Sequence, residues 1–146
     1  MLVRLLIALI MNIPISFINF GSYLKGTAPT PIQVGCTIFF LLLWLIWAGN
    51  ESYRRCGKPT FLRFSTLYWL TALLLTFIGY MSEELLLGIP VMMIFLGPLY
   101  GLRIFLPELA YDHFAYVSLF IAYAMSMAGY LLGIFLRNYL PKQKAN

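Results

Sequence analysis

The side chains best able to carry chemistry form one small charged group. Arg103 is the one charge well inside an apolar segment, and Glu108, Asp112 and His113 follow it closely in the chain. Such a cluster can gate a pathway or relay protons. In the alternative, Arg103 extends to the membrane interface and forms a salt bridge with Glu108 or Asp112. We expect the interfacial salt bridge.

A second group of polar residues lies inside the first apolar segment. Asn12, Ser16 and Asn19 recur at helical spacing, with Tyr23 one turn further, so a helix places them on one face. Carboxamides left unpaired in hydrocarbon cost several kcal/mol, so we expect this polar stripe to point into the bundle, a partner or a water-filled cavity. It is then either interhelical hydrogen bonding or the lining of a permeation path, helped by Pro14.

The most polar stretch of the chain is a basic loop over residues 50–63. It contains Arg54, Arg55, Lys58 and Arg63, which can hold the phosphate of an anionic lipid or of an isoprenoid. The tendency of cytoplasmic loops to carry Lys and Arg explains the same charges without a ligand. The basic excess is therefore read as topology, and no nucleic-acid partner is expected.

Enzymatic chemistry has little support in the sequence. His113 is the only histidine, Cys36 and Cys56 form no CxxC pair, and no nucleophile-elbow, zinc-protease or P-loop motif is present. We therefore expect no metal site and no cofactor, and lean towards a protein that is not an enzyme.

One acidic pair resembles a known catalytic feature. Glu83 and Glu84 resemble the paired glutamates of intramembrane proteases that process prenylated proteins. The arginine expected soon after that pair is absent from EELLLGIP, and no set of histidines follows. We therefore interpret the pair as a solvated turn that Ser82 caps.

The composition identifies the medium in which these residues lie. Of the 146 residues, 62% are hydrophobic and 10% are charged, whereas roughly a quarter of the residues of a soluble domain are charged. The charges collect in short clusters between long apolar stretches. The chain is therefore expected to be one integral membrane domain over residues 1–146, with the lipid bilayer as its partner and no soluble domain.

Five apolar segments can each form a helix of the length that crosses a bilayer, roughly 20 residues. They are continuously apolar, which favours an all-α bundle over a barrel of alternating strands. A turn of Gly, Thr and Pro separates the first two, and three residues separate the third and fourth, which must form a close hairpin. The five predicted helices cover residues 5–24, 32–49, 64–81, 85–106 and 114–136, followed by a basic tail over 137–146.

Two of these segments carry small residues and helix breakers. The fourth contains Pro90, Gly97, Pro98 and Gly101, which predict a kinked or interrupted helix of the kind that coordinates ions in transporters, or an ordinary membrane helix rich in Gly and Pro. The fifth presents a packing face of small residues, in the same chain or in another copy: Ala122, Ser126, Gly129 and Gly133.

Hydropathy and charge disagree on the number of crossings. Five crossings leave six Lys and Arg residues inside against four outside, whereas four crossings leave eight against two. The fourth segment is long for a re-entrant loop, so we expect five crossings, with four as the alternative. Either count places the loop 50–63 in the cytoplasm, with Trp44, Trp47, Tyr68 and Trp69 near it as an aromatic anchor at the membrane surface.

These observations favour a small non-enzymatic protein of the cell or inner membrane. We expect either transport as a homo-oligomer or an accessory role beside a larger membrane protein, since five short helices enclose little space. The stripes on the first and fifth segments are two candidate contact faces for another chain. The alternative is a membrane enzyme acting on a lipid or isoprenoid phosphate at the cytoplasmic surface.

Overall fold

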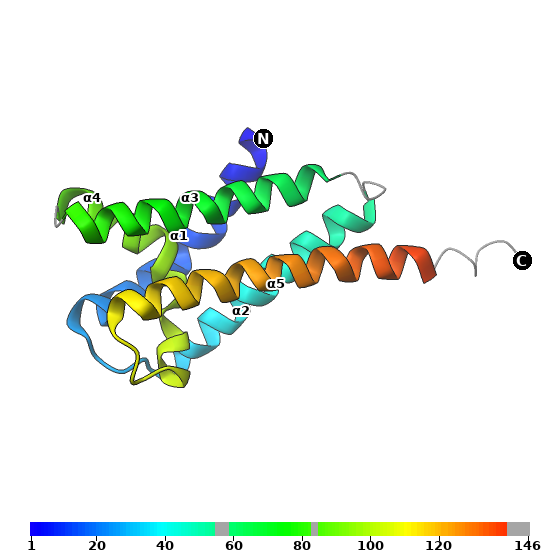
Figure 1. Ribbon diagram of the computed structural model, residues 1–146. Coiled ribbons are helices and arrows are strands. Elements are labelled where there is room, and N and C mark those ends of the chain that lie inside the picture. The colour runs from blue at the N-terminus through cyan, green and yellow to red at the C-terminus, as the bar shows by residue number, and fades with distance from the viewer. Residues whose placement is uncertain (55–58, 83–84, 140–146) are drawn as a thin grey trace, which may run out of the picture.

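The chain forms a bundle of helices in the computed structural model, which describes residues 1–54, 59–82 and 85–139 (Figure 1). It is 91% helical, and five helical segments are long and apolar enough to cross a membrane. The prediction of a polytopic all-α membrane bundle is therefore confirmed. Its elements in chain order are α1 (Leu2–Lys25), α2 (Pro31–Arg54), α3 (Thr60–Ser82), α4 (Leu85–Val91), η1 (Met92–Leu96), η2 (Gly97–Phe105) and α5 (Tyr111–Tyr139).

The turn between α1 and α2 is closed by local hydrogen bonds. Gly26 has φ 63°, a left-handed conformation that glycine adopts without strain, and its amide and that of Thr27 donate to the last carbonyls of α1. Thr30 and Gln33 then bond reciprocally, with the Thr30 amide 2.9 Å from Gln33 Oε1 and the Gln33 amide 3.4 Å from Thr30 Oγ1. This capping box begins α2 at Pro31, a residue suited to the first helical position.

The two ends of the bundle differ in side-chain chemistry. At one, the tyrosine end, the Tyr23 and Tyr80 hydroxyls bond at 3.0 Å, and Tyr80 donates to the carbonyl of Tyr111. At the other, the basic end, Arg4 pairs with Glu51 at 2.6 Å and donates to the carbonyl of Thr60. Helices α1 and α3 therefore run from the basic end to the tyrosine end.

Helices α2 and α5 run together in the opposite direction, from the tyrosine end to the basic end. The α-carbon of Gly129 lies against the Leu45 carbonyl, and that of Gly133 lies against the Gly49 carbonyl. Because the residue numbers of the paired positions rise together along both helices, the two helices are parallel. The packing face of Ala122, Ser126, Gly129 and Gly133 is buried and has its partners in this chain, where Ser126 Oγ also accepts from Trp69 Nε1 at 3.1 Å.

The fourth apolar segment does not run the length of the bundle. It starts beside the end of α3, where Gly88 packs on Gly79, and reaches the middle, where the Ile94 carbonyl meets Asn12. It then turns back, and the Tyr100 hydroxyl donates to the carbonyl of Thr27 at 2.6 Å. Figure 1 shows its second half ending near the start of α5, at the end of the bundle where it began.

This path favours the alternative of four crossings over the expected five, although the segment is apolar and long enough to cross a membrane. Four helices run from end to end, and residues 85–105 form a re-entrant segment. Hydropathy could not reveal this, because a segment that enters and returns is as apolar as one that crosses. The distribution of Lys and Arg pointed to the observed path.

Two further expectations need correction. The predicted loop 50–63 is shorter, because α2 continues to Arg54 and α3 begins at Thr60, so the helices extend beyond their apolar stretches. The aromatic residues near that loop pack inside the bundle: Trp44 is fully buried, with ring centroids 5.2 Å from Tyr68 and 5.0 Å from Trp69. Trp44, Tyr68 and Trp69 form a buried aromatic core, and Trp47 is the one member of the predicted anchor that is only half-buried.

The glycine seam between α2 and α5 gives a test of this packing. A β-carbon at residue 129 would lie 2.2 Å from the Leu45 carbonyl oxygen, so Gly129→Ala forces two backbones apart. We expect it to destabilise the chain by about 1–3 kcal/mol, as overpacking does. Gly35→Ala is the control, because a β-carbon there meets nothing within 4 Å. Thermal unfolding of the full chain in detergent measures both, and equal melting temperatures would contradict the seam.

Candidate functional site

The candidate site is the re-entrant segment together with the polar side chains that hold it. Helix α4 ends at Val91, η1 is one π-helical turn, and η2 is a 3-10 helix. The interruption predicted from the proline and glycine content is therefore present. Pro98 lies at its centre, and Pro90 lies inside α4.

Pro98 leaves a carbonyl without its usual donor. In an α-helix the carbonyl of Ile94 accepts from the amide four residues later, and proline has no such amide. Asn12 Nδ2 donates to this carbonyl at 3.0 Å and to the Tyr68 hydroxyl at 2.7 Å. A carboxamide of α1 thus replaces the missing backbone donor in the middle of the bundle.

The carbonyl of Pro98 itself is satisfied by two other helices. Thr37 of α2 donates its hydroxyl at 2.8 Å, and Asn19 Nδ2 lies 3.5 Å away. The Thr37 hydroxyl also accepts from the amide of Gly101 at 3.0 Å. One threonine therefore satisfies a donor and an acceptor of the re-entrant backbone.

Two glycines let this backbone approach its neighbours closely. A β-carbon at Gly97 would lie 3.1 Å from Ser16, and one at Gly101 would lie 2.6 Å from the carbonyl of Gln33. A 3-10 helix has three residues per turn, so residues four apart point in different directions. The two glycines of this GxxxG pair therefore contact different helices, α1 and α2.

The predicted polar stripe of α1 lies inside the bundle, as expected. Asn12, Ser16 and Asn19 are fully buried and Tyr23 is 7% exposed. Three oxygens of the stripe have no hydrogen-bond partner in the described residues: Asn12 Oδ1, Ser16 Oγ and Asn19 Oδ1. The amide nitrogens of Asn12 and Asn19 thus donate to the re-entrant segment and to Tyr68 and Thr37, whereas these three oxygens of the stripe have no partner in that part of the chain.

Neither predicted contact face is available to another chain. The stripe of α1 covers the re-entrant segment, and the small-residue face of α5 covers α2 and α3. The prediction that both are contact surfaces for a second chain is therefore not met in this structure. Burial within one chain could not be distinguished from burial against a second chain by residue type alone.

The charged cluster predicted near residue 110 does not form. Arg103 is half-buried, donates to the carbonyl of Leu109, and lies over two rings, 4.7 Å from the centroid of Tyr111 and 5.3 Å from that of Phe114. In the described part of the chain it makes no ion pair with Glu108 or Asp112. The expected salt bridge is therefore wrong, because cation–π contacts and a carbonyl satisfy the guanidinium instead.

The remaining members of this cluster lie at the surface. Glu108, Asp112 and His113 are exposed, and His113 Nδ1 lies 3.2 Å from the carboxylate of its neighbour Asp112. Asp112 is in the first turn of α5, where a negative charge favours the helix. In this structure Asp112 therefore stabilises the start of α5, and the three residues form no buried charged site.

The basic residues predicted to contact lipid are only partly described. Arg54 ends α2 and Arg63 lies in the first turn of α3, and both side chains are exposed. Arg55 and Lys58 lie outside the described residues, as do Glu83, Glu84 and the tail from residue 140. Among the described residues, no group of three His, Cys, Asp or Glu side chains is arranged to hold a metal ion.

Known proteins add no further guide to this site. No protein-family model, no curated protein and no solved structure matches the chain. The class of protein is therefore defined by its fold, a multi-pass helical membrane protein with a re-entrant segment.

A mutant cycle tests whether Asn12 replaces the donor that Pro98 lacks. Asn12→Leu should destabilise the chain by about 1–2 kcal/mol, the size of a hydrogen bond between membrane helices. In a Pro98→Ala background the loss should be smaller, because the new amide can reach the carbonyl of Ile94. Unfolding of the full chain in detergent, followed by circular dichroism, measures each variant.

Asn19→Leu is the control for this cycle. Asn19→Leu removes a donor to the carbonyl of residue 98, and Pro98→Ala gives that carbonyl no new donor. The loss of stability caused by Asn19→Leu should therefore be the same in both backgrounds. Equal costs of Asn12→Leu in both backgrounds would contradict the proposed replacement.

Proposed function

We propose that this chain is a non-enzymatic membrane protein for transport or permeation, with the re-entrant segment as its working element. The observation that carries the proposal is non-α backbone held in the middle of the bundle by fully buried polar side chains. Such backbone is costly in a membrane and is typical of the ion and substrate sites of channels and transporters.

The chemistry of the segment supports a polar or cationic cargo. A row of oxygens lies between α1 and the re-entrant segment. It consists of the backbone carbonyls of Ile94 and Pro98 and of side-chain oxygens of α1 that have no hydrogen-bond partner among the described residues: those of Asn12, Ser16 and Asn19. Oxygens of this kind replace the water around a cation or a small polar solute. The stripe is fully buried in this conformation, so transport requires the re-entrant segment to move or another chain to complete the path.

Orientation is part of the proposal. By their place in the chain, eight of the ten Lys and Arg residues belong to the basic end, and Lys25 and Arg103 belong to the tyrosine end. Positive residues concentrate on the cytoplasmic side. We therefore place the protein in the cell or inner membrane with its basic end, including the loop 50–63, in the cytoplasm.

A reversible lock on the re-entrant segment tests the proposal. Residues 16 and 97 face each other, and a β-carbon at 97 would lie 3.1 Å from that of Ser16. The β-carbons of a disulfide are about 3.5–4.5 Å apart, so the two backbones must separate by a few tenths of an ångström to form one. A Ser16→Cys, Gly97→Cys chain lacking Cys36 and Cys56 is reconstituted in vesicles. Permeability to water, protons and potassium is measured when oxidised and again after dithiothreitol.

We expect the reduced protein to raise permeability to at least one of these above that of empty vesicles, and oxidation to abolish the increase. Each single-cysteine variant is a control and should ignore the oxidant. Native mass in mild detergent, with identification of co-purifying chains, distinguishes the assemblies. A homo-oligomer with flux supports transport, whereas absence of flux beside a stoichiometric larger partner would overturn it in favour of an accessory subunit.

A further inference from the structure

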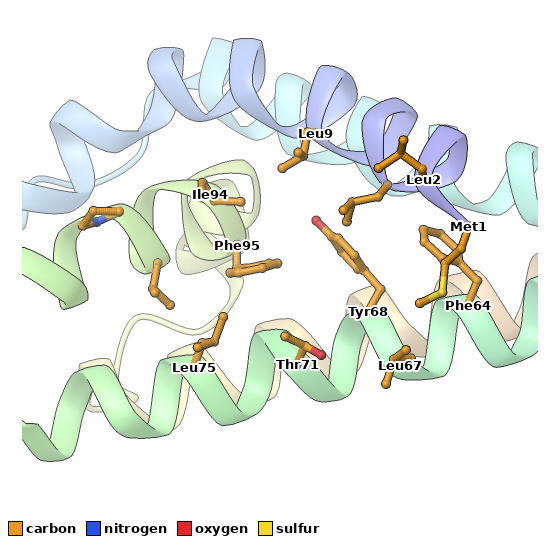
Figure 2. Close-up of a pocket in the computed structure, with 13 residues that line it drawn as sticks. Met1, Leu2, Leu9, Phe64, Leu67, Tyr68, Thr71, Leu75, Ile94 and Phe95 are labelled. Carbon is orange, nitrogen blue, oxygen red and sulfur yellow. The ribbon is translucent and has the colours of Figure 1, made fainter.

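A groove of about 560 Å³ lies between α1, α3 and the first half of the re-entrant segment (Figure 2). Leu2 and Leu9 of α1 face Tyr68 and Thr71 of α3 across it, and Ile94 and Phe95 close one end. Its volume is in the range of ligand pockets, about 300–1,000 Å³. Its lining is almost entirely apolar, which suits a hydrocarbon chain.

The groove opens to the surrounding lipid along its side. Leu5 and Leu67 line it and remain 41% and 47% exposed, within helices that are apolar enough to cross a membrane. A bilayer offers lipid chains to such an opening directly. A soluble ligand would first have to cross the charged surface.

The length of the groove matches one leaflet. Its lining along α3 runs from Phe64 to Leu75, and the eleven steps between these residues, at 1.5 Å each, give about 17 Å. The hydrocarbon core of a bilayer is about 30 Å thick, so one leaflet is roughly half of that. The groove therefore extends from the basic end to the middle of the bundle, as an acyl chain does.

The charge at the basic end favours an anionic headgroup. Arg63 lies one turn before Leu67 on the same face of α3, is exposed, and has no ion pair in the described part of the chain. Arg4, the other arginine near this end of the groove, is already paired with Glu51 at 2.6 Å. Arg63 is therefore a described cation available to a phosphate at the mouth of the groove, together with the ammonium group of Met1, which lines the groove.

We infer that this groove binds one acyl chain of an anionic phospholipid from the leaflet at the basic end, with its phosphate at Arg63. The chain would lie against Phe95 and Tyr68, which pack on each other with ring centroids 5.5 Å apart. Since Tyr68 bonds Asn12, a bound lipid would support the residues that hold the re-entrant segment. The inference goes beyond the proposed function and does not depend on transport.

Lipid retention by the full-length protein tests the inference. The delipidated chain in detergent is titrated with phosphatidylglycerol or with phosphatidylcholine of the same acyl chains, and bound lipid is counted by native mass spectrometry. We expect one tightly bound phosphatidylglycerol. Arg63→Gln should reduce the preference for it by about fivefold, the effect of one basic residue near an anionic surface.

Filling the groove separates this site from lipid that merely surrounds the protein. Thr71→Trp should remove the tight site for both lipids, whereas Leu74→Trp, on the same helix but outside the lining, should bind as the unchanged chain does. If Thr71→Trp fails to fold, Leu9→Trp fills the groove from α1. The inference is overturned if the groove-filling variant retains phosphatidylglycerol as Leu74→Trp does, if both lipids bind equally to the unchanged chain, or if a long-chain isoprenyl phosphate displaces phosphatidylglycerol at equal concentration.

Discussion

Backbone carbonyls without a helical partner cannot be left bare inside a bilayer, because hydrocarbon offers no hydrogen bonds in return. Pro98 creates this problem at the carbonyl of Ile94, and the 3-10 turn after it turns the carbonyl of Pro98 towards α1 and α2. Asn12, Asn19 and Thr37 satisfy these two carbonyls, since each donates a hydrogen bond to one of them. The polar residues of α1 are thus required by the prolines and glycines of a segment far away in the sequence.

The rest of the bundle gives this segment its space. Helices α2 and α5 lie so close along Gly129 and Gly133 that little side-chain volume separates them. The buried aromatic residues around Trp44 fill the basic half of the bundle, and the re-entrant segment fills the tyrosine half. The aromatic core and the re-entrant segment pack on each other through Tyr68 and Phe95, so each depends on the other for its contacts.

Much of the fold could be read from the sequence, because long apolar runs and turn residues identify membrane helices directly. The Gly, Thr and Pro residues between the first two segments indicate a turn, and the proline and glycine content of residues 85–106 indicates a break. The path of the fourth segment could not be predicted, since apolarity shows that a segment lies in the membrane and not whether it crosses or turns back. The partners of Asn12 and Gly129 could not be predicted, because they lie in segments distant in sequence. The partners of Arg103 are only six to eleven residues away, but its charge pointed to nearby acidic residues and not to a carbonyl and two rings.

The central claim is that residues 85–105 enter and leave the bundle at the same end. Four variants, each with a single cysteine and none with Cys36, test it. One keeps the native Cys56, and the other three lack Cys56 and carry Thr27→Cys, Glu108→Cys or Lys142→Cys. Each is labelled in oriented vesicles with a maleimide that does not cross the membrane. The account predicts that residues 27 and 108 react from one side of the membrane and residues 56 and 142 from the other. Labelling of residue 108 from the side of Cys56 would contradict it, because the fourth segment would then cross the membrane.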